Sequence, residues 1–344
     1  MTETPPEMQL RQAEIQEAAS FVEPLRAAIG QTLVGQSELV DCLLIGLLTG
    51  GHVLVEGLPG LAKTLAVKTL AAAVGGRFSR LQFTPDLLPA DLIGTTVYNP
   101  GDHSFTVKPG PIFANLILAD EVNRAPAKVQ SALLEAMQER QVTIGGESRP
   151  LPFPFLVMAT QNPIEHEGTY NLPEAQIDRF MLKARVDYPE REEEREIMRR
   201  MAHPEPPPPT APVLRLEQIG EARKAIDQVY LDPKIEEYIL DLTIATRPRH
   251  GRPIALSERQ SQVRLERIEE LVEFGASPRA TLALALAAKA KAFLQVRAYV
   301  VPRDVKDVAP QVLRHRLILN YEAEAENMTG HDLVAWLLGE LRTP

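Results

Sequence analysis

The 344-residue chain has little cysteine, little tryptophan and no long apolar run, and these shortages exclude several classes of protein. Its one cysteine, Cys42, rules out an internal disulfide framework and suits a reducing cytosol. That residue stands in the apolar run VDCLLIGLL, which favours inert packing in a core. No run approaches the roughly 20 apolar residues of a membrane-spanning helix, and the N-terminus lacks a secretory signal. We therefore expect a cytoplasmic protein.

Positive charge is also in short supply. Lys and Arg number 37 against 46 Asp and Glu, which gives a formal net charge of −9. Such a balance argues against a general nucleic-acid binder, although it leaves a local basic pore open. The 44% hydrophobic and 24% charged residues are typical of a globular protein, and the length suffices for two domains.

Proline is concentrated in the stretch HPEPPPPTAP, residues 203–212. Such a segment can be neither a helix nor a central strand, and we expect a stiff, extended linker there. Five short apolar segments precede it, separated by helical patterns: 52–57, 78–83, 115–121, 155–162 and 180–188. Runs that are apolar on both faces are typical of parallel central strands, so the first part should be a three-layer α/β domain.

The pattern after the proline-rich stretch is helical. Apolar residues recur at helical spacing on one face, at Ile235, Tyr238, Ile239 and Leu242. Further on, Ser277 and Pro278 have the residue types of an N-cap and a first helical position. The second part should therefore be a small helical bundle.

The stretch GLPGLAKT, which begins at Gly57, lies between a predicted strand and a predicted helix. It matches the phosphate-binding pattern G-x-x-x-x-G-K-[ST] except at Ala62, where the pattern has glycine. In such a loop Lys63 would contact the β- and γ-phosphates, and Thr64 would hold Mg²⁺. The alternative is a plain Gly-Pro turn between strand and helix.

Ala62 decides whether the loop is intact. We expect this residue to lie at the helix entry with a negative φ, where alanine is comfortable, so that the loop still binds a nucleotide. The expected nucleotide-binding residues of the loop are Gly57, Leu58, Pro59, Gly60, Leu61, Ala62, Lys63, Thr64 and Leu65.

Polar residues follow two other predicted strands. In NLILADEVNR, Asp120 would hold the magnesium and Glu121 would act as the general base on the attacking water. In FLVMATQNP, Asn162 could orient that water through a neutral amide. The alternatives are an Asp-Glu pair that caps the next helix and a common Asn-Pro turn.

The ordered motifs GLPGLAKT, LILADEVNRAP, ATQNP, LPEAQIDRF and GASPRA resemble those of the AAA+ ATPases, in particular the MoxR family. The stretch LQFTPDLLPADLIGT is similar to that family too, and the resemblance covers roughly residues 29–319. It implies an AAA+ P-loop ATPase core with a parallel sheet, followed by a small all-helical lid domain. It also implies ATP and Mg²⁺ as ligands and a ring that is typically a hexamer.

The resemblance assigns further residues. Val34, Gly35 and Gln36 match the segment that packs on the adenine. Arg179 matches the arginine finger, which contacts the γ-phosphate of the neighbouring subunit, and Arg279 matches the second sensor arginine of the lid. From the sequence alone, a surface ion pair of Arg179 with Asp178 or Glu174 is favoured over the finger, and the alternative for Arg279 is a solvated first-turn residue.

Three segments extend this plan. Two hairpins are expected, one with NPGD and the other with GG as its turn, and in relatives such hairpins face the pore or the substrate. The charged stretch 248–273 departs from the family pattern and is expected to be an insertion, part basic loop and part amphipathic helix. It could dock a partner, but we favour a longer lid, because charge-laced helices usually face solvent.

The expected organisation is a lead-in at 1–28 that is helical or disordered, an ATPase domain at 29–202, the linker, and a lid domain at 213–344. The resemblance implies chaperone-like remodelling of client proteins with von Willebrand factor A domains, including metal insertion or complex maturation. The alternatives are the motor subunit of a metal chelatase and a nucleotide-gated scaffold with little turnover. A DNA-loading or helicase ATPase is disfavoured by the negative charge.

Overall fold

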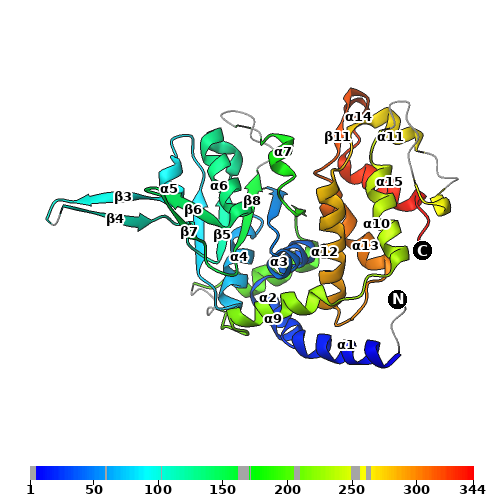
Figure 1. Ribbon diagram of the computed structural model, residues 1–344, viewed down its shortest axis with the longest axis horizontal. Coiled ribbons are helices and arrows are strands. Elements are labelled where there is room, and N and C mark those ends of the chain that lie inside the picture. The colour runs from blue at the N-terminus through cyan, green and yellow to red at the C-terminus, as the bar shows by residue number, and fades with distance from the viewer. Residues whose placement is uncertain are drawn as a thin grey trace. The chain divides into compact units, whose positions relative to one another are not determined.

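The computed structural model describes residues 5–58, 60–101, 103–161, 170, 172–204, 210–248, 256–260 and 265–344, with side chains from residue 8 onward. Contacts divide the chain into two compact units (Figure 1). The α/β unit comprises Phe21–Phe180 and Ala184–Gly220, and the helical unit comprises Met1–Ser20, Met181–Lys183 and Glu221–Pro344. This division falls after the predicted linker at 203–212, of which residues 205–209 lie outside the described ranges.

A parallel five-stranded sheet forms the centre of the α/β unit, with the strand order β2-β5-β8-β1-β9. Its strands are β1 (Val53–Gly57), β2 (Phe78–Gln82), β5 (Leu116–Asp120), β8 (Leu156–Gln161) and β9 (Leu182–Val186). All five strands predicted from the sequence are therefore present. The helices between them are α2 (Val22–Thr32), α3 (Ser37–Thr49), α4 (Lys63–Ala73), α5 (Pro89–Ile93), α6 (Ala127–Glu139), α7 (Glu174–Ile177) and α8 (Arg191–Met201), with the 3₁₀ turn η1 (Val122–Arg124).

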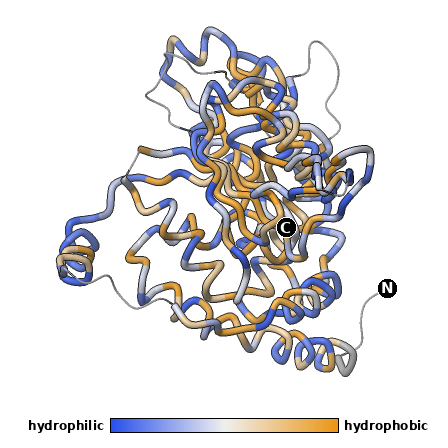
Figure 2. Tube along the Cα trace, turned by 90° about the vertical axis from the view of Figure 1, so that its left-hand side faces the viewer, coloured by the Kyte–Doolittle hydropathy of each residue, from blue (hydrophilic) through white to orange (hydrophobic). Residues whose placement is uncertain are grey.

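Both faces of the central strands β1, β5 and β8 are buried, which explains why these three strands are apolar over most of their length. Leu54, Ile117 and Val157 point to one face and share a core cluster with Leu133 of α6. On the other face α3 packs so closely that its Gly46 lies directly against β1 and β8. The hydrophobic residues gather along these central strands in Figure 2. The fold is the predicted three-layer α/β arrangement.

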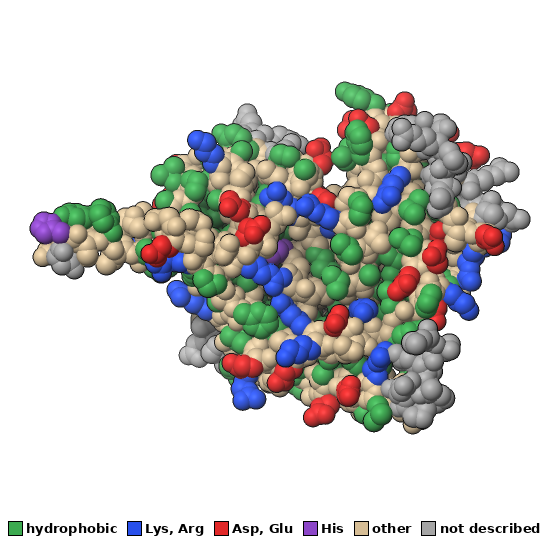
Figure 3. Space-filling view, viewed as in Figure 1, with side chains coloured by type: hydrophobic (Ala, Val, Ile, Leu, Met, Phe, Trp, Pro, Cys, Tyr) green, Lys and Arg blue, Asp and Glu red, His purple; other side chains and the backbone are tan. Residues whose placement is uncertain are grey.

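Two antiparallel hairpins leave this core, as the sequence predicts. The first pairs β3 (Gly94–Asn99) with β4 (Ser104–Pro109), and the second pairs β6 (Gln141–Ile144) with β7 (Glu147–Pro150). The β3–β4 hairpin projects from the α/β unit and carries exposed apolar side chains along its length (Figures 1 and 3). Tyr98 and Phe105 face each other across it, with ring centroids 5.2 Å apart.

The helical unit contains the predicted bundle. Its helices are α1 (Pro5–Ala18), α10 (Pro233–Ala245), α11 (Glu266–Leu271), α12 (Pro278–Leu294), α13 (Pro302–Leu313), α14 (Tyr321–Ala325) and α15 (Gly330–Glu340), with η2 (Glu258–Gln260) and most of α9 (Leu216–Asp227). The apolar stripe predicted on α10 is buried. Ser277 caps α12 and accepts a hydrogen bond from the backbone of Arg279, also as predicted. Trp336, the one tryptophan of the chain, lies on α15 and is half-buried.

The charged stretch at 248–273 is packed into this unit over its second half. Leu265, Ile268, Leu271 and Val272 are each at most 2% exposed. The predicted helix, α11, is only six residues long, because Val272 begins the strand β10 (Val272–Phe274), which pairs with β11 (Ile318–Leu319). The sequence did not indicate this strand. Residues 249–255 and 261–264 lie outside the described ranges.

Two expectations from composition can be compared with the structure. Cys42 is 2% exposed, in agreement with inert core packing. Among the residues that the structure describes, no helix has the length and apolar character required to cross a bilayer.

Candidate active site

A polar cavity of about 400 Å³ opens where the parallel strands of the sheet end. Ligands of open α/β sheets bind in this position, because loops and helix N-termini converge there. The lining residues come from the predicted phosphate loop and from three strand ends: Gly60, Ala62, Lys63, Thr64, Leu65, Arg80, Gln82, Asp120, Glu121 and Thr160. The fold therefore brings the loop and the acidic pair of the sequence analysis into one cavity.

The loop is held between β1 and α4. Gly57 passes so close to β9 that a Cβ there would lie 2.5 Å from the carbonyl oxygen of Val186, so no larger residue fits. Lys63 opens α4, and its Nζ donates to the carbonyl oxygen of Gly57 at 2.6 Å. Burial lowers the pKa of Lys63 below 10.5, while the charges of Asp120 and Glu121 act in the opposite direction. Thr64 follows it at the helix N-terminus, where backbone N–H groups favour an anion.

Ala62 corrects the sequence analysis. The expected negative φ is wrong: Ala62 has φ 57° and ψ 16°, in the left-handed region. The residue lies just before α4, and the path of the loop into the helix requires a left-handed conformation there. Phosphate-binding loops have glycine at this position because glycine adopts that conformation readily. An alanine in this region costs about 1 kcal/mol or more. The loop thus adopts its shape although Ala62 is strained, and the expectation that alanine is free of strain at this position is wrong.

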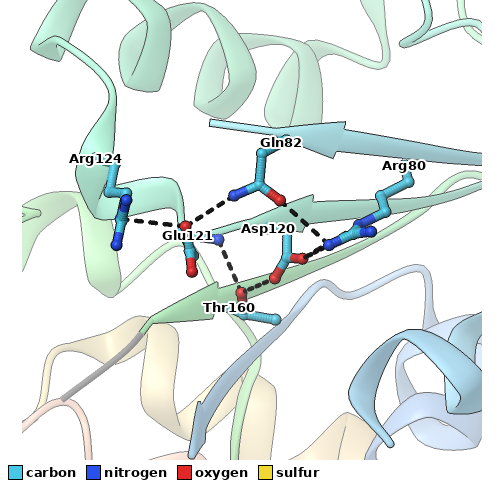
Figure 4. Close-up of polar contacts among 6 residues, drawn as sticks. All are labelled: Arg80, Gln82, Asp120, Glu121, Arg124 and Thr160. Atoms are coloured by element: carbon cyan, nitrogen blue, oxygen red, sulfur yellow. Dashed lines mark hydrogen bonds and ion pairs between the residues drawn. The ribbon is translucent and has the colours of Figure 1, made fainter. Parts of the chain in front are cut away.

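Asp120 is fixed by residues on both neighbouring strands (Figure 4). Its Oδ1 accepts a hydrogen bond from Thr160 Oγ1 of β8 at 2.7 Å. Its Oδ2 accepts from Arg80 of β2, at 2.6 Å from Nη2 and 3.2 Å from Nε. Both carboxylate oxygens therefore have defined partners in this state.

Glu121 is held by a second set of donors. Its Oε2 accepts from Gln82 Nε2 at 2.8 Å and forms an ion pair with Arg124 Nε at 3.1 Å. Its backbone N–H donates to Thr160 Oγ1 at 2.9 Å. Figure 4 shows the two carboxylates side by side at the end of β5, each with one arginine.

A second cavity, also of about 400 Å³, adjoins the first across the loop. Gly60, Ala62 and Leu65 line both cavities. The lining of the second is largely apolar and also comprises Thr32, Leu33, Val34, Gln36, Leu61, Tyr188, Pro189, Glu194, Ile197, Arg200 and Met201. A polar cavity and an apolar one that share a loop can accommodate a phosphate chain and a planar base respectively.

The predicted adenine segment forms part of this apolar cavity. Val34 and Gln36 line it, and Gln36 Nε2 donates to the carbonyl oxygen of Asp187 at 3.1 Å. Gly35 has φ 67°, and a Cβ on it would lie 2.6 Å from the carboxylate of Glu193. The backbone conformation therefore favours a glycine, and a side chain there would also displace the carboxylate of Glu193.

Five predicted residues are not placed in this group by the described structure, and the first of them, Leu58, lines neither cavity. Pro59 and Asn162 lie outside the described residues. Arg179 follows α7; its Nε is shielded from solvent and has no hydrogen-bond partner within the described ranges. Arg279 lies in the first turn of α12, in the helical unit.

Sequence reasoning missed Arg80, Gln82, Arg124 and Thr160. Arg80 and Gln82 point to the cavity from β2, and Thr160 reaches it from β8. Their relevance depends on the strand order, which places β5 between these two strands. For Thr160 the available signal was a polar residue near the end of an otherwise apolar predicted strand, because such ends face the ligand in parallel sheets.

Known families and proteins match this chain over most of its length. Residues 52–182 match the model of the ATPase family associated with various cellular activities (AAA), and residues 264–335 match the AAA lid domain. The lid match includes α11 and β10, the second half of the expected insertion.

Individual relatives are similar over nearly the whole chain. The chain is 49% identical to Chaperone MoxR1 of Mycobacterium tuberculosis, over 95% of this chain and 84% of that protein. It is 33% identical to the protein MoxR of Methylorubrum extorquens, over 85% of each. A crystal structure of a candidate ATPase from Cytophaga hutchinsonii superposes with a TM-score of 0.87 at 46% identity, covering 98% of this chain and 99% of the other.

Proposed function

Because the chain belongs to the MoxR family of AAA+ ATPases, it is an ATPase, and we propose that it uses Mg²⁺-dependent ATP hydrolysis to remodel client proteins. The observation that supports this proposal most directly is the single cavity shared by Lys63, Thr64, Asp120 and Glu121. A phosphate-binding loop alone would serve binding, whereas an adjoining pair of carboxylates adds the means to move a proton.

The phosphates bind at the loop. Lys63 leaves the carbonyl of Gly57 and neutralises the β- and γ-phosphates, while the N-terminus of α4 contributes backbone donors. The adjoining apolar cavity takes the adenine against Val34 and the backbone of Gly35 and Gln36. Loss of the Lys63–Gly57 contact on binding offsets part of the gain, since the loop exchanges one bond for another.

The chain supplies two oxygen ligands suited to Mg²⁺, the hydroxyl of Thr64 and a carboxylate oxygen of Asp120, which line the same cavity. Within the described residues, no group of three or more His, Cys, Asp and Glu side chains forms a cage for a metal. A two-ligand protein site fits Mg²⁺, which takes its other ligands from phosphate and water. The ion, when bound, neutralises charge that develops on the transferring phosphoryl group.

Glu121 acts as the general base. A water attacks the γ-phosphorus, the bond to the β–γ bridging oxygen breaks, and the water proton moves to the carboxylate of Glu121. In the present structure Gln82 and Arg124 hold that carboxylate, so their donors must yield to the water. Asn162 orients the same water.

Arg179 acts on a neighbouring copy in a ring, which we propose to be a hexamer. A buried guanidinium nitrogen without a hydrogen-bond partner in the described structure is costly, so it suits a group that completes its contacts elsewhere. A guanidinium supplied in trans stabilises charge on the γ-phosphate. Arg279 couples the nucleotide state to closure of the lid.

The clients we propose are proteins with von Willebrand factor A domains, matured by the ATP cycle, in some cases with metal insertion. One of the relatives supports a chaperone role, since it is named Chaperone MoxR1. The motor subunit of a metal chelatase is the alternative, and the two differ in the client that the ATP-bound ring retains.

A direct test starts from the purified chain. Phosphate release should depend on Mg²⁺ and vanish in excess EDTA, and light scattering should show ring-sized particles in ATP. The variant Glu121→Gln cannot accept the proton. It should bind ATP and remain assembled, but its rate of hydrolysis should fall by at least about 100-fold. Equal activity in EDTA would overturn the Mg²⁺ assignment, and wild-type activity in this variant would remove Glu121 as the base.

The client is tested with the same variant. Glu121→Gln immobilised with ATP should retain proteins with von Willebrand factor A domains from a lysate of the native cell, identified by mass spectrometry. The matched control is Lys63→Ala, which presents the same surface without ATP. Enrichment of chelatase subunits alone would favour the alternative, and an identical set of proteins on both variants would contradict ATP-dependent client binding.

A further inference from the structure

Thr160 touches both acidic residues of the proposed ATPase site with a single hydroxyl group. Its Oγ1 donates to Asp120 Oδ1 at 2.7 Å and accepts from the backbone N–H of Glu121 at 2.9 Å (Figure 4). The side chain is 1% exposed and lies in the middle of the sheet, between β5 and β1. Its donor and one of its acceptor positions are thus committed to two consecutive residues of β5.

These side-chain hydrogen bonds join β5 and β8 beyond the point where their backbone pairing ends. The parallel ladder between β5 and β8 ends at the pair Ala119 and Ala159, so Asp120 and Thr160 are the next residues on each strand. Thr160 remains paired with Val55 of β1 on its other side, which fixes its backbone. The hydroxyl therefore ties the last residue of β5 and the first residue beyond it to a strand that cannot move independently.

The bond to Glu121 matters because of the backbone there. Successive side chains of a strand point to opposite faces, so Asp120 and Glu121 would ordinarily lie on opposite sides of the sheet. Glu121 instead has φ 57° and ψ 50°, in the left-handed region, and both carboxylates line one cavity. A non-glycine residue holds this conformation only when its surroundings favour it by more than about 1 kcal/mol.

The bond to Asp120 determines which carboxylate oxygen a ligand can reach once Arg80 leaves. With Oδ1 committed to Thr160, Oδ2 is the oxygen that contacts the exposed side chain of Arg80. A rotated carboxylate would lose the bond to a buried hydroxyl, which leaves an unpaired polar atom and costs about 1–3 kcal/mol. The side chain of Thr160 thus fixes the orientation of the Asp120 carboxylate and stabilises the backbone turn that directs Glu121 into the cavity.

We infer that Thr160 is a positioning residue for ATP hydrolysis: its hydroxyl holds Asp120 and Glu121 in the geometry that the reaction needs. The inference rests on the proposed roles of these two acids. Thr160 has no proposed contact with the phosphates of ATP or with the attacking water. Its removal should therefore impair turnover and the response to Mg²⁺ while leaving Mg²⁺-free nucleotide binding at Lys63 intact.

The experiment compares Thr160→Val, which keeps the shape and loses the hydroxyl, with Thr160→Ser, which restores it. Thr243→Val is the matched control, because Thr243 is equally buried and its hydroxyl donates only to the helix carbonyl of Ile239. The measurements are kcat and KM for ATP, the affinity for a fluorescent ATP analogue in EDTA, the Mg²⁺ concentration that gives half-maximal tightening of that affinity, and the melting temperature.

For Thr160→Val we expect kcat to fall by about 10- to 100-fold, as is usual when a hydrogen-bond partner of a reacting group or metal ligand is lost. The affinity in EDTA should stay within about twofold of wild type, and more Mg²⁺ should be needed to tighten it. Thr160→Ser should recover most of the loss, and Thr243→Val should retain wild-type values. Should Thr160→Val fail to fold, Thr160→Ala takes its place, because it also lacks the hydroxyl group.

Wild-type kcat in Thr160→Val or Thr160→Ala would overturn the inference. So would a serine variant no better than the valine variant, or a loss of kcat that merely follows a lowered melting temperature. Glu121→Gln, assayed alongside, separates this failure from that of the proposed function. If Glu121→Gln is inactive and Thr160→Val is active, only the role of Thr160 is wrong; if Glu121→Gln is active, the assignment of the base is wrong.

Discussion

Arg80 Nη2 lies 2.6 Å from Asp120 Oδ2, so a cation of the protein occupies the oxygen that we propose for Mg²⁺. The guanidinium comes from β2 and is 51% exposed, which allows it to leave. Because two positive charges repel each other at one carboxylate oxygen, the arginine and the metal ion should compete.

We predict that Arg80→Gln lowers the Mg²⁺ concentration needed for half-maximal ATPase activity at saturating ATP. The effect should reach up to about fivefold, since an exposed ion pair is worth at most about 1 kcal/mol. Arg267→Gln is the control, because it removes a comparably exposed pair, with Glu326, in the helical unit. A higher Mg²⁺ requirement in Arg80→Gln would show that the arginine assists the metal site instead.

Lys63 should be indispensable for nucleotide affinity. Lys63→Ala removes the cation of the loop, and we expect the affinity for ATP to fall by about 100-fold, because a hydrogen bond to a charged group is worth up to about 3 kcal/mol. Isothermal titration calorimetry with ATP measures this directly. Lys68→Ala, one turn along α4 from the loop, is the control and should bind as wild type does. Retained wild-type affinity in Lys63→Ala would refute the assignment of the loop.

Ala62→Gly tests the left-handed residue of the loop. Glycine adopts φ 57° without steric cost, whereas alanine there costs about 1 kcal/mol or more. We expect ATPase activity to be retained and the free energy of unfolding in urea to stay equal or rise by up to about 1 kcal/mol. The control Ala66→Gly lies in a regular turn of α4 and should lose about 1 kcal/mol. Equal destabilisation by both changes would contradict a strained Ala62.

Arg179 should act across a subunit boundary, and mixing tests this. Arg179→Ala should bind ATP and hydrolyse it at least about 1000-fold more slowly, whereas Lys63→Ala should bind ATP too weakly for turnover yet still present Arg179 to its neighbour. Rings that contain both variants have some interfaces with an intact loop facing an intact arginine. Phosphate release should therefore recover in part on mixing, and should rise with protein concentration as rings assemble.

The mixing experiment needs proof of co-assembly, obtained by labelling the two variants with different fluorophores. Co-assembled rings without any recovery would mean that Arg179 acts within its own subunit or not at all. The sequence argument for a ring would then lose its main support.

The sequence predicts the fold well because the sheet is covered on both faces. A strand such as β5 (Leu116–Asp120) is apolar along its length and ends in carboxylates, and both features are visible without coordinates. The meeting of Lys63 and Asp120 follows as well, since the ends of parallel strands share one edge of the sheet.

The partners of the acidic pair could not be predicted in the same way. Thr160 and Arg80 reach Asp120 from opposite sides only because β5 lies between β8 and β2, and that order is a property of the sheet as a whole. The left-handed conformation of Ala62 could not be predicted from the sequence for a related reason. Its side chain is compatible with a helix entry, and the demand for a left-handed residue comes from the path of the loop.

The single tryptophan makes the indole fluorescence of the protein specific for one of its two units. Trp336 lies on α15 in the helical unit, so fluorescence excited at wavelengths selective for indole originates in that unit alone. The loop, the acidic pair and both cavities described above belong to the α/β unit, which contributes only tyrosine. Any change in indole emission when ATP is added to the unlabelled chain is consequently a report from a part of the protein other than the one that contains the proposed phosphate site.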